Sequence, residues 1–137
     1  MRFSLCCVFL GAGLLFGCGE MECEPFDGTY LAATSERSGT CGPVGETLVQ
    51  MRDGEQVGGD AGCVVDYDRV TENNCKTERS VTCTSQADGL VITGVGVFEA
   101  DDESGSSASG VLTMTVKSLS TGATQCSSTY DVTYTRQ

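Results

Sequence analysis

Six of the nine cysteines, those that follow Cys18, constrain the fold of this chain more than any other feature of the sequence. No two of them form a C-x-x-C pair and the chain contains no histidine, so zinc ligation is not expected. An even set of cysteines in a small exported domain instead indicates a disulfide framework. Six cysteines allow 15 pairings, and we expect three disulfides. The six are Cys23, Cys41, Cys63, Cys75, Cys83 and Cys126.

Export is indicated by the first 17 residues. Arg2 and the free amino terminus form a small positive head, and residues 3–16 then contain no charge. This is the pattern of a secretory signal peptide. The apolar run is shorter than the about 20 residues that a membrane-spanning helix needs, because Gly19 and Glu20 follow Cys18 directly.

Residues 15–18, Leu-Phe-Gly-Cys, resemble the lipobox of bacterial lipoproteins, with the departure that Phe16 stands where the pattern prefers Ala or Ser. The resemblance implies diacylglyceryl transfer to the Cys18 thiol and cleavage before Cys18. Ordinary signal cleavage near residues 17–19 is the alternative, and it leaves the same six cysteines. Stable anchoring takes more than one acyl chain, and a fully processed lipoprotein of this kind carries three. Because Gly19 rather than Asp follows Cys18, the resemblance further implies the outer membrane.

The expected organisation is a signal peptide over residues 1–17, a lipidated tether over residues 18–27 and one β domain over residues 28–137. Removal of the signal peptide removes Arg2 and no acidic residue, so the formal charge changes from −11 to −12. Such an acidic chain repels nucleic acid and anionic lipid headgroups. The remaining basic residues form no run, so nucleic acid is not an expected partner.

The composition favours a fold that depends on its cross-links. There is no Trp, 18 of the 137 residues are Gly, and Ser and Thr are abundant. A chain with so few large apolar side chains buries a modest core for its size. In the chain-entropy model, a disulfide that closes a loop of a few tens of residues contributes about 3 to 4 kcal/mol.

Apolar residues that recur with a period of two predict β-strands separated by turn-rich segments. No segment has the period of an amphipathic helix. About seven strands with short connections argue for an all-β domain, an antiparallel meander that forms a small barrel or sandwich. The expected strands are residues 28–34, 46–52, 63–68, 78–84, 90–100, 110–119 and 123–136.

Two of these strands carry further detail. Leu112, Met114 and Val116 alternate with polar residues and are expected to point inward. Gly94 and Gly96 fall on one side of the strand at residues 90–100, and glycines inside a strand often mark a bend or a close backbone approach. We expect this strand to be central or curved.

Two disulfides can be suggested from facing positions. Cys63 and Cys83 lie on same-facing positions of two successive strands and can bridge them. Cys126 on the last strand can then return to Cys41.

Four aromatic residues can line a ligand-holding barrel interior. The simpler interpretation is that they fill the core, as buried aromatic side chains usually do. These candidate ligand-binding residues are Tyr30, Phe98, Tyr130 and Tyr134.

Two acidic groups are candidates for chemistry. The oxygen atoms of residues 101–103, Asp-Asp-Glu, suit Ca²⁺, but they lack the alternating spacing of a calcium loop, so a solvated acidic hairpin tip is favoured. Asp66 and Asp68 lie two residues apart, so on a regular strand they share a face where paired carboxylates can do acid–base work. Their alternation with apolar neighbours favours an outward, solvent-facing position instead.

Nucleophilic catalysis is not expected. A Ser or Cys nucleophile normally relies on a His base, and the chain has none. A Ser–Lys pair would need Lys76 or Lys117, which both lie in polar, surface-like contexts. We therefore expect no catalytic residue, no metal ligand and no cofactor.

Two further resemblances concern the domain. The Gly-Thr-Tyr opening at residues 28–30, after a short polar lead, is similar to the Gly-x-aromatic start of lipocalin-like barrels. The order of lipobox, Gly-Thr-Tyr strand, Thr-Cys-Gly loop and final Tyr-x-Val-Thr-Tyr strand resembles small uncharacterised lipoproteins of Gram-negative bacteria. The second resemblance covers most of the chain and implies no particular activity.

We expect a non-catalytic lipoprotein of the cell envelope, a binding or structural module. Its expected partners are the lipid bilayer, through acylated Cys18, and an envelope protein or small ligand. One alternative is a lipocalin-like carrier of a small apolar ligand, which requires a cavity of a few hundred Å³. Another is a secreted inhibitor or adhesion protein with a filled interior, acting through an exposed loop at residues 53–62 or 101–109.

Overall fold

The computed structural model describes residues 21–57 and 62–137. The expected signal peptide, the lipidation site Cys18 and the start of the tether lie outside the described residues, as do residues 58–61 of one candidate loop. No helix in the described part of the chain is long and apolar enough to cross a membrane. The eight strands are β1 (Gly28–Gly39), β2 (Glu46–Arg52), β3 (Glu55–Val57), β4 (Cys63–Val70), β5 (Lys76–Ser85), β6 (Leu90–Ala100), β7 (Ser107–Ser118) and β8 (Thr124–Arg136).

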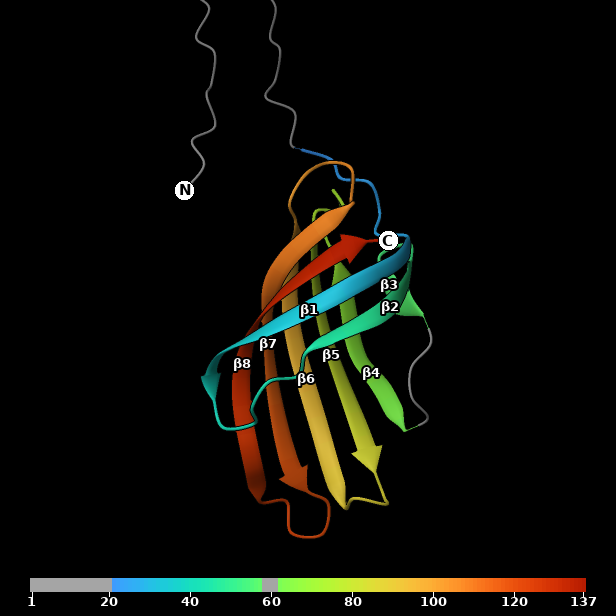
Figure 1. The fold of residues 1–137 in the computed structure, drawn as a ribbon. Coiled ribbons are helices and arrows are strands. Elements are labelled where there is room, and N and C mark those ends of the chain that lie inside the picture. The colour runs from blue at the N-terminus through green and yellow to red at the C-terminus, as the bar shows by residue number, and fades with distance from the viewer. Residues whose placement is uncertain (1–20, 58–61) are drawn as a thin grey trace, which may run out of the picture.

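All eight strands belong to one antiparallel sheet with the order β3-β2-β1-β8-β7-β6-β5-β4 (Figure 1). The first and last strands are neighbours, because β1 pairs with β8 from Tyr30–Arg136 to Gly39–Ser128. Every other ladder joins consecutive strands, so the sheet is an up-and-down barrel that is nearly closed. Among the described strands, only β3 and β4 are consecutive without being paired. We call the opening between them the seam.

The expected all-β, antiparallel, disulfide-linked architecture is confirmed, but the strand count is eight rather than seven. The additional strand, β3, lies in the segment that was expected to be a turn. Asp53 and Gly54 have φ angles of 52° and 83° between the paired residues Arg52 and Glu55. Positive φ at both central residues is the signature of a two-residue type I′ hairpin, for which Asp-Gly is a preferred sequence.

The core consists of two clusters of inward-facing side chains. Phe26, Tyr30 and Ala108 form one cluster. The other contains Phe98, Tyr130 and Val132, and Leu112 and Met114 pack against it as their alternation predicted. The largest fully buried side chains are Tyr30, Tyr130 and Val132, at 1%, 0% and 2% exposed.

The ring of Phe98 explains two of the glycines. A Cβ atom on Gly96 would lie 2.5 Å from this ring, and one on Gly110 would lie 2.7 Å from the ring and 2.0 Å from the Val97 carbonyl oxygen. Only glycine leaves room for the ring to lie across the inner surfaces of β6 and β7. The expectation of a close approach along β6 is therefore met at Gly96, whereas Gly94 faces Leu112 at an ordinary 3.5 Å.

The three disulfides connect different parts of the sheet. Cys63–Cys83 joins β4 to β5, and Cys41–Cys126 joins the loop after β1 to β8. Both pairings suggested by the sequence are confirmed. The third disulfide, Cys23–Cys75, joins the segment before β1 to the turn between β4 and β5.

The segment that leads into β1 is fixed to one end of the barrel, which we call the anchored end. The Cys23 N–H donates to the Asn73 carbonyl and the Glu24 N–H donates to the Glu103 carbonyl, both at 2.8 Å. Cys23 and Phe26 are 5% and 4% exposed. The chain from Cys23 onward is therefore packed on the barrel, so the second half of the segment that was expected to be a tether belongs to the domain.

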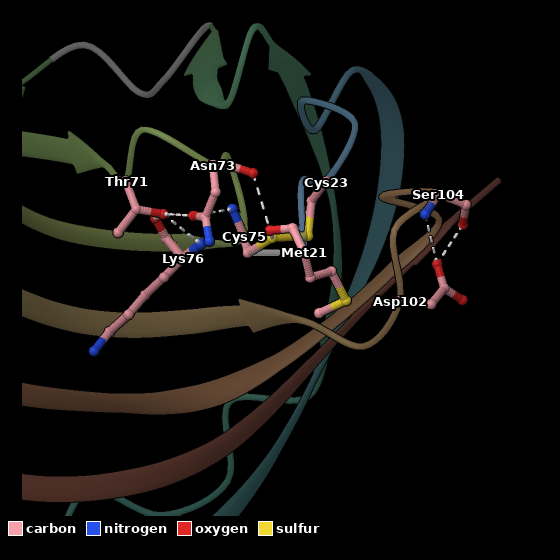
Figure 2. The surroundings of a disulfide bond; sticks show 8 residues. All are labelled: Met21, Cys23, Thr71, Asn73, Cys75, Lys76, Asp102 and Ser104. Atoms are coloured by element: carbon pink, nitrogen blue, oxygen red, sulfur yellow. Dashed lines mark hydrogen bonds between the residues drawn. A yellow bond between two sulfur atoms is a disulfide. The ribbon is translucent and has the colours of Figure 1, made fainter. Parts of the chain in front are cut away.

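The β4–β5 turn is built to hold this disulfide (Figure 2). The Asn73 carboxamide oxygen accepts hydrogen bonds from the Thr71 hydroxyl at 2.6 Å and the Cys75 N–H at 3.2 Å. Asn74 has a φ of 58°, a left-handed conformation that asparagine tolerates better than most residues. The turn thus presents Cys75 to Cys23 from a rigid frame.

Candidate functional site

Two of the four predicted ligand-binding aromatics serve the structure through their hydroxyl groups. Tyr30 donates to the Gly105 carbonyl at 2.6 Å and accepts from Arg136 at 3.0 and 3.2 Å. Tyr130 donates to the Gly42 carbonyl at 2.8 Å. Both side chains are therefore engaged at opposite ends of the barrel, Tyr30 at the anchored end and Tyr130 near the Cys41 loop.

The other two predicted aromatics pack against each other. The rings of Phe98 and Tyr134 make an edge-to-face contact with centroids 4.9 Å apart. Burial raises the pKa of Tyr134 to about 12, and the positive charge of Arg79 partly opposes this shift.

A small cavity of about 40 Å³ lies beside this aromatic pair. Tyr30, Phe98 and Tyr134 line it, together with Thr77 and Arg79. The Thr77 hydroxyl is buried without a hydrogen-bond partner among the described residues. The cavity is about an order of magnitude smaller than the few hundred Å³ that a pocket enclosing a small ligand needs.

A cluster of polar side chains bridges the seam. Arg79 on β5 donates to Asp68 Oδ2 on β4 from Nε at 3.2 Å and from Nη2 at 2.5 Å. Its Nη1 donates to Gln56 Oε1 on β3 at 2.8 Å. The Arg79 and Asp68 side chains are only 12% and 11% exposed. Across the described part of the seam, side chains thus make the contacts that backbone pairing makes elsewhere in the barrel.

The position of Asp68 corrects the expectation that Asp66 and Asp68 share a solvent-facing side of one strand. The register of β4 against β5 shifts between Val65 and Tyr67, so Asp66 is the extra residue of a β-bulge. The bulge reverses the alternation, and Asp68 points inward while Asp66 remains exposed. Asp66 accepts hydrogen bonds from the hydroxyls of Ser80 and Thr82 at 3.2 and 2.8 Å.

A second, larger hollow is a groove of about 790 Å³ along the described part of the seam. This volume lies within the range of about 300 to 1,000 Å³ that small-molecule sites occupy. Arg79 and Gln56 line both the groove and the smaller cavity and so separate the two. The groove is lined by Thr47, Leu48, Val49 and Gln50 of β2, Gln56 and Val57 of β3, Cys63 and Val65 of β4, and Arg79, Val81 and Cys83 of β5.

The acidic tip between β6 and β7 is ordered by its own hydrogen bonds. The Asp102 carboxylate accepts from the Ser104 hydroxyl and N–H at 2.5 and 2.9 Å (Figure 2), and these bonds lower the pKa of Asp102. Within the described ranges no three His, Cys, Asp or Glu side chains gather as metal ligands would. The tip contacts the anchored end through Glu103 and Gly105 rather than protruding freely.

Sequence reasoning missed Arg79, which is the one charged side chain among the groove-lining residues of the described chain. A signal was present, because residue 79 has the same parity along the strand as the apolar residues Val81 and Cys83. An arginine on an inward face requires an acidic partner. Only the bulge at Asp66 makes Asp68 that partner.

Comparison of the chain with models of known protein families, with curated protein sequences and with solved structures finds no match. The function is therefore argued from the groove and the residues around it.

Proposed function

We propose that this chain is an exported, lipid-anchored, non-catalytic binding module of the cell envelope, and that its ligand occupies the seam groove. The observation that carries the proposal is the groove itself, a hollow of about 790 Å³, whereas the cavity beside Phe98 and Tyr134 measures only about 40 Å³. Its walls combine apolar side chains with a few polar groups, which is the usual composition of a binding site.

The proposal of a lipid anchor is based on the lipobox-like residues 15–18. The disulfide Cys23–Cys75 limits how far the domain can lie from such an anchor. Five residues from Cys18 to Cys23 span at most about 18 Å when fully extended. An acylated Cys18 would therefore keep the anchored end close to the bilayer surface. Because Gly19 rather than Asp follows Cys18, the resemblance to the lipobox implies that this bilayer is the outer membrane.

The groove would then open away from the lipid. β4 runs from Cys63 to Val70, and the β4–β5 turn at the anchored end follows Val70 (Figure 1). The groove-lining residues Cys63 and Val65 lie at the other end of β4. Such a module would present its groove to soluble or envelope partners rather than to the membrane that holds it.

Two adjacent valines provide a matched test of the groove. Val65 lines the groove and Val64 faces outside, and they are 49% and 64% exposed. Detergent-solubilised mature protein serves as bait in envelope extract, as wild type and as the Val65→Lys and Val64→Lys variants. We expect Val64→Lys to retain the bound material and Val65→Lys to lose it. Equal capture by both variants would refute the groove as the site.

The anchor has its own test. We expect incorporation of a labelled fatty acid into the wild type and none into Cys18→Ala, which would leave the membrane fraction. Membrane attachment of the Cys18→Ala variant equal to the wild type would contradict the proposed anchor while leaving the groove proposal intact.

A further inference from the structure

Two strand edges with free backbone groups face each other across the seam. Within the described residues, β3 covers only Gln50–Arg52 of β2, so residues 46–49 of β2 pair on one side only, with β1. Among the described strands, β4 pairs only with β5. A row of unpaired N–H and C=O groups at a sheet edge is a template for a further strand.

The register identifies which groups of β4 are free. The Thr84 N–H donates to the Gly62 carbonyl at 2.9 Å, so Gly62 and Thr84 form a hydrogen-bonded pair. Hydrogen-bonded and non-hydrogen-bonded pairs alternate along an antiparallel ladder. The backbone groups of Val64 therefore point toward β5, and those of Cys63 and Val65 point into the seam.

The remainder of the β4 edge is protected against strand addition. A bulge at Asp66 and the inward charge of Asp68 interrupt it, and both are devices by which proteins block edge pairing. The stretch Cys63–Val65 carries neither device, and the Cys63–Cys83 disulfide fixes it to β5. The available edge is therefore short, rigid and placed on the groove.

The side chains beside this edge suit a strand with apolar residues on alternate positions. Val57, Val65 and Val81 form apolar walls of the groove. Leu48, which is 64% exposed, lines the groove on the side of β2. Free main-chain groups beside apolar pockets are the elements of peptide recognition by strand addition.

Charge decides what kind of strand fits. The chain has 19 acidic and 8 basic residues, and Glu46, which is exposed, directly precedes the groove residue Thr47 of β2. The charge of Arg79 is already paired with Asp68. A second copy of this acidic chain would be repelled, whereas a basic segment would be attracted.

We propose that the groove binds an extended polypeptide segment carrying Lys or Arg side chains, which adds to β4 through the backbone of Cys63 and Val65. This inference rests on the proposed groove function and names its partner class. The bound strand continues the sheet across the part of the seam beside Cys63 and Val65, with its apolar side chains inward and its basic side chains toward Glu46.

The test uses a synthetic nine-residue peptide, in which Val alternates with Thr or Lys, and the ¹⁵N-labelled mature protein in detergent. We expect the peptide to slow amide hydrogen exchange of Cys63 and Val65 while leaving that of Val64 unchanged. An analogue N-methylated at alternate backbone positions loses two or more hydrogen bonds and should bind at least tenfold more weakly. A peptide with Glu in place of Lys should also bind at least tenfold more weakly at low salt.

Several results would overturn the proposal. Binding of the N-methylated analogue as strong as that of the parent peptide would mean that side chains alone are recognised. Absence of protection at Cys63 and Val65, or protection caused by self-association in sedimentation experiments, would exclude a basic strand as occupant. These outcomes are separate from the failure of the groove function, which is equal capture of envelope material by Val65→Lys and Val64→Lys.

Discussion

Removing the charge of Asp68 should destabilise the domain far more than removing that of an exposed aspartate. Asp68→Asn preserves the shape of the side chain but leaves the buried Arg79 guanidinium without its counter-charge. The two side chains are 11% and 12% exposed, and breaking one partner out of a buried pair costs about 3 to 5 kcal/mol. With a urea m-value of about 1.5 kcal/mol/M, the unfolding midpoint should fall by about 2 to 3 M.

The matched control is Asp131→Asn. Asp131 pairs with Arg37 on the outer surface, where the side chains are 52% and 54% exposed. Such exposed pairs contribute about 0 to 1 kcal/mol. Urea unfolding with intact disulfides, followed by circular dichroism, measures both variants. Equal midpoints for Asp68→Asn and Asp131→Asn would refute the assignment of Asp68–Arg79 as a buried bridge.

A double replacement separates the loss of a partner from the loss of the bridge. Asp68→Leu with Arg79→Met removes both charges, and such exchanges are often neutral or stabilising by about 1 to 4 kcal/mol. We expect the double variant to be at least as stable as Asp68→Asn. A double variant that is less stable than Asp68→Asn would mean that the attraction within the bridge, rather than the cost of an unpaired charge, accounts for the loss of stability.

Three further predictions concern the barrel. The pKa of Tyr134 is raised to about 12 from an ordinary 10, so its contribution to the stability of the fold is fully present below pH 10 and is lost as the pH rises toward 12. At pH 11, urea unfolding of the wild type should show a loss of about 1.4 kcal/mol that the Tyr134→Phe variant lacks. Gly110→Ala, whose Cβ would meet a backbone carbonyl at 2.0 Å, should cost at least about 1 to 3 kcal/mol in the same assay, whereas Gly94→Ala, with its nearest contact at 3.5 Å, should be close to neutral. Mass spectrometry should find no free thiol among the six cysteines of the mature domain. Replacing Cys41 and Cys126, which are 85 residues apart, should cost about 4.5 kcal/mol of stability. Replacing the cysteines of the disulfide between β4 and β5, which are 20 residues apart, should cost about 3.3 kcal/mol.

Much of this barrel can be predicted from the sequence, because the patterns that specify its strands and turns lie within short stretches of the chain. The alternation of apolar residues in β7 and β8 sets their inward faces, and two disulfides follow from facing positions. The hairpin at Asp53 and Gly54 was also readable, since Asp-Gly is a type I′ signal. It was missed because β3 has only three residues and alternates weakly.

The candidate site is less accessible to sequence reasoning, because it depends on non-local features. The bulge at Asp66 changes which aspartate points inward, and no residue type at that position announces it. The seam depends on which strands fail to pair. In an up-and-down barrel the opening is expected between the first and last strands, whereas here it lies between β3 and β4.

The pairing of β1 with β8 determines when the domain can fold. The Tyr30 hydroxyl and its partner Arg136 are 106 residues apart, and contacts so distant along a chain form slowly. In the export proposed above, a polypeptide that crosses the membrane amino terminus first would deliver β1 long before β8. Its first strand would then wait for its last one, and the domain would stay unfolded until translocation is nearly complete.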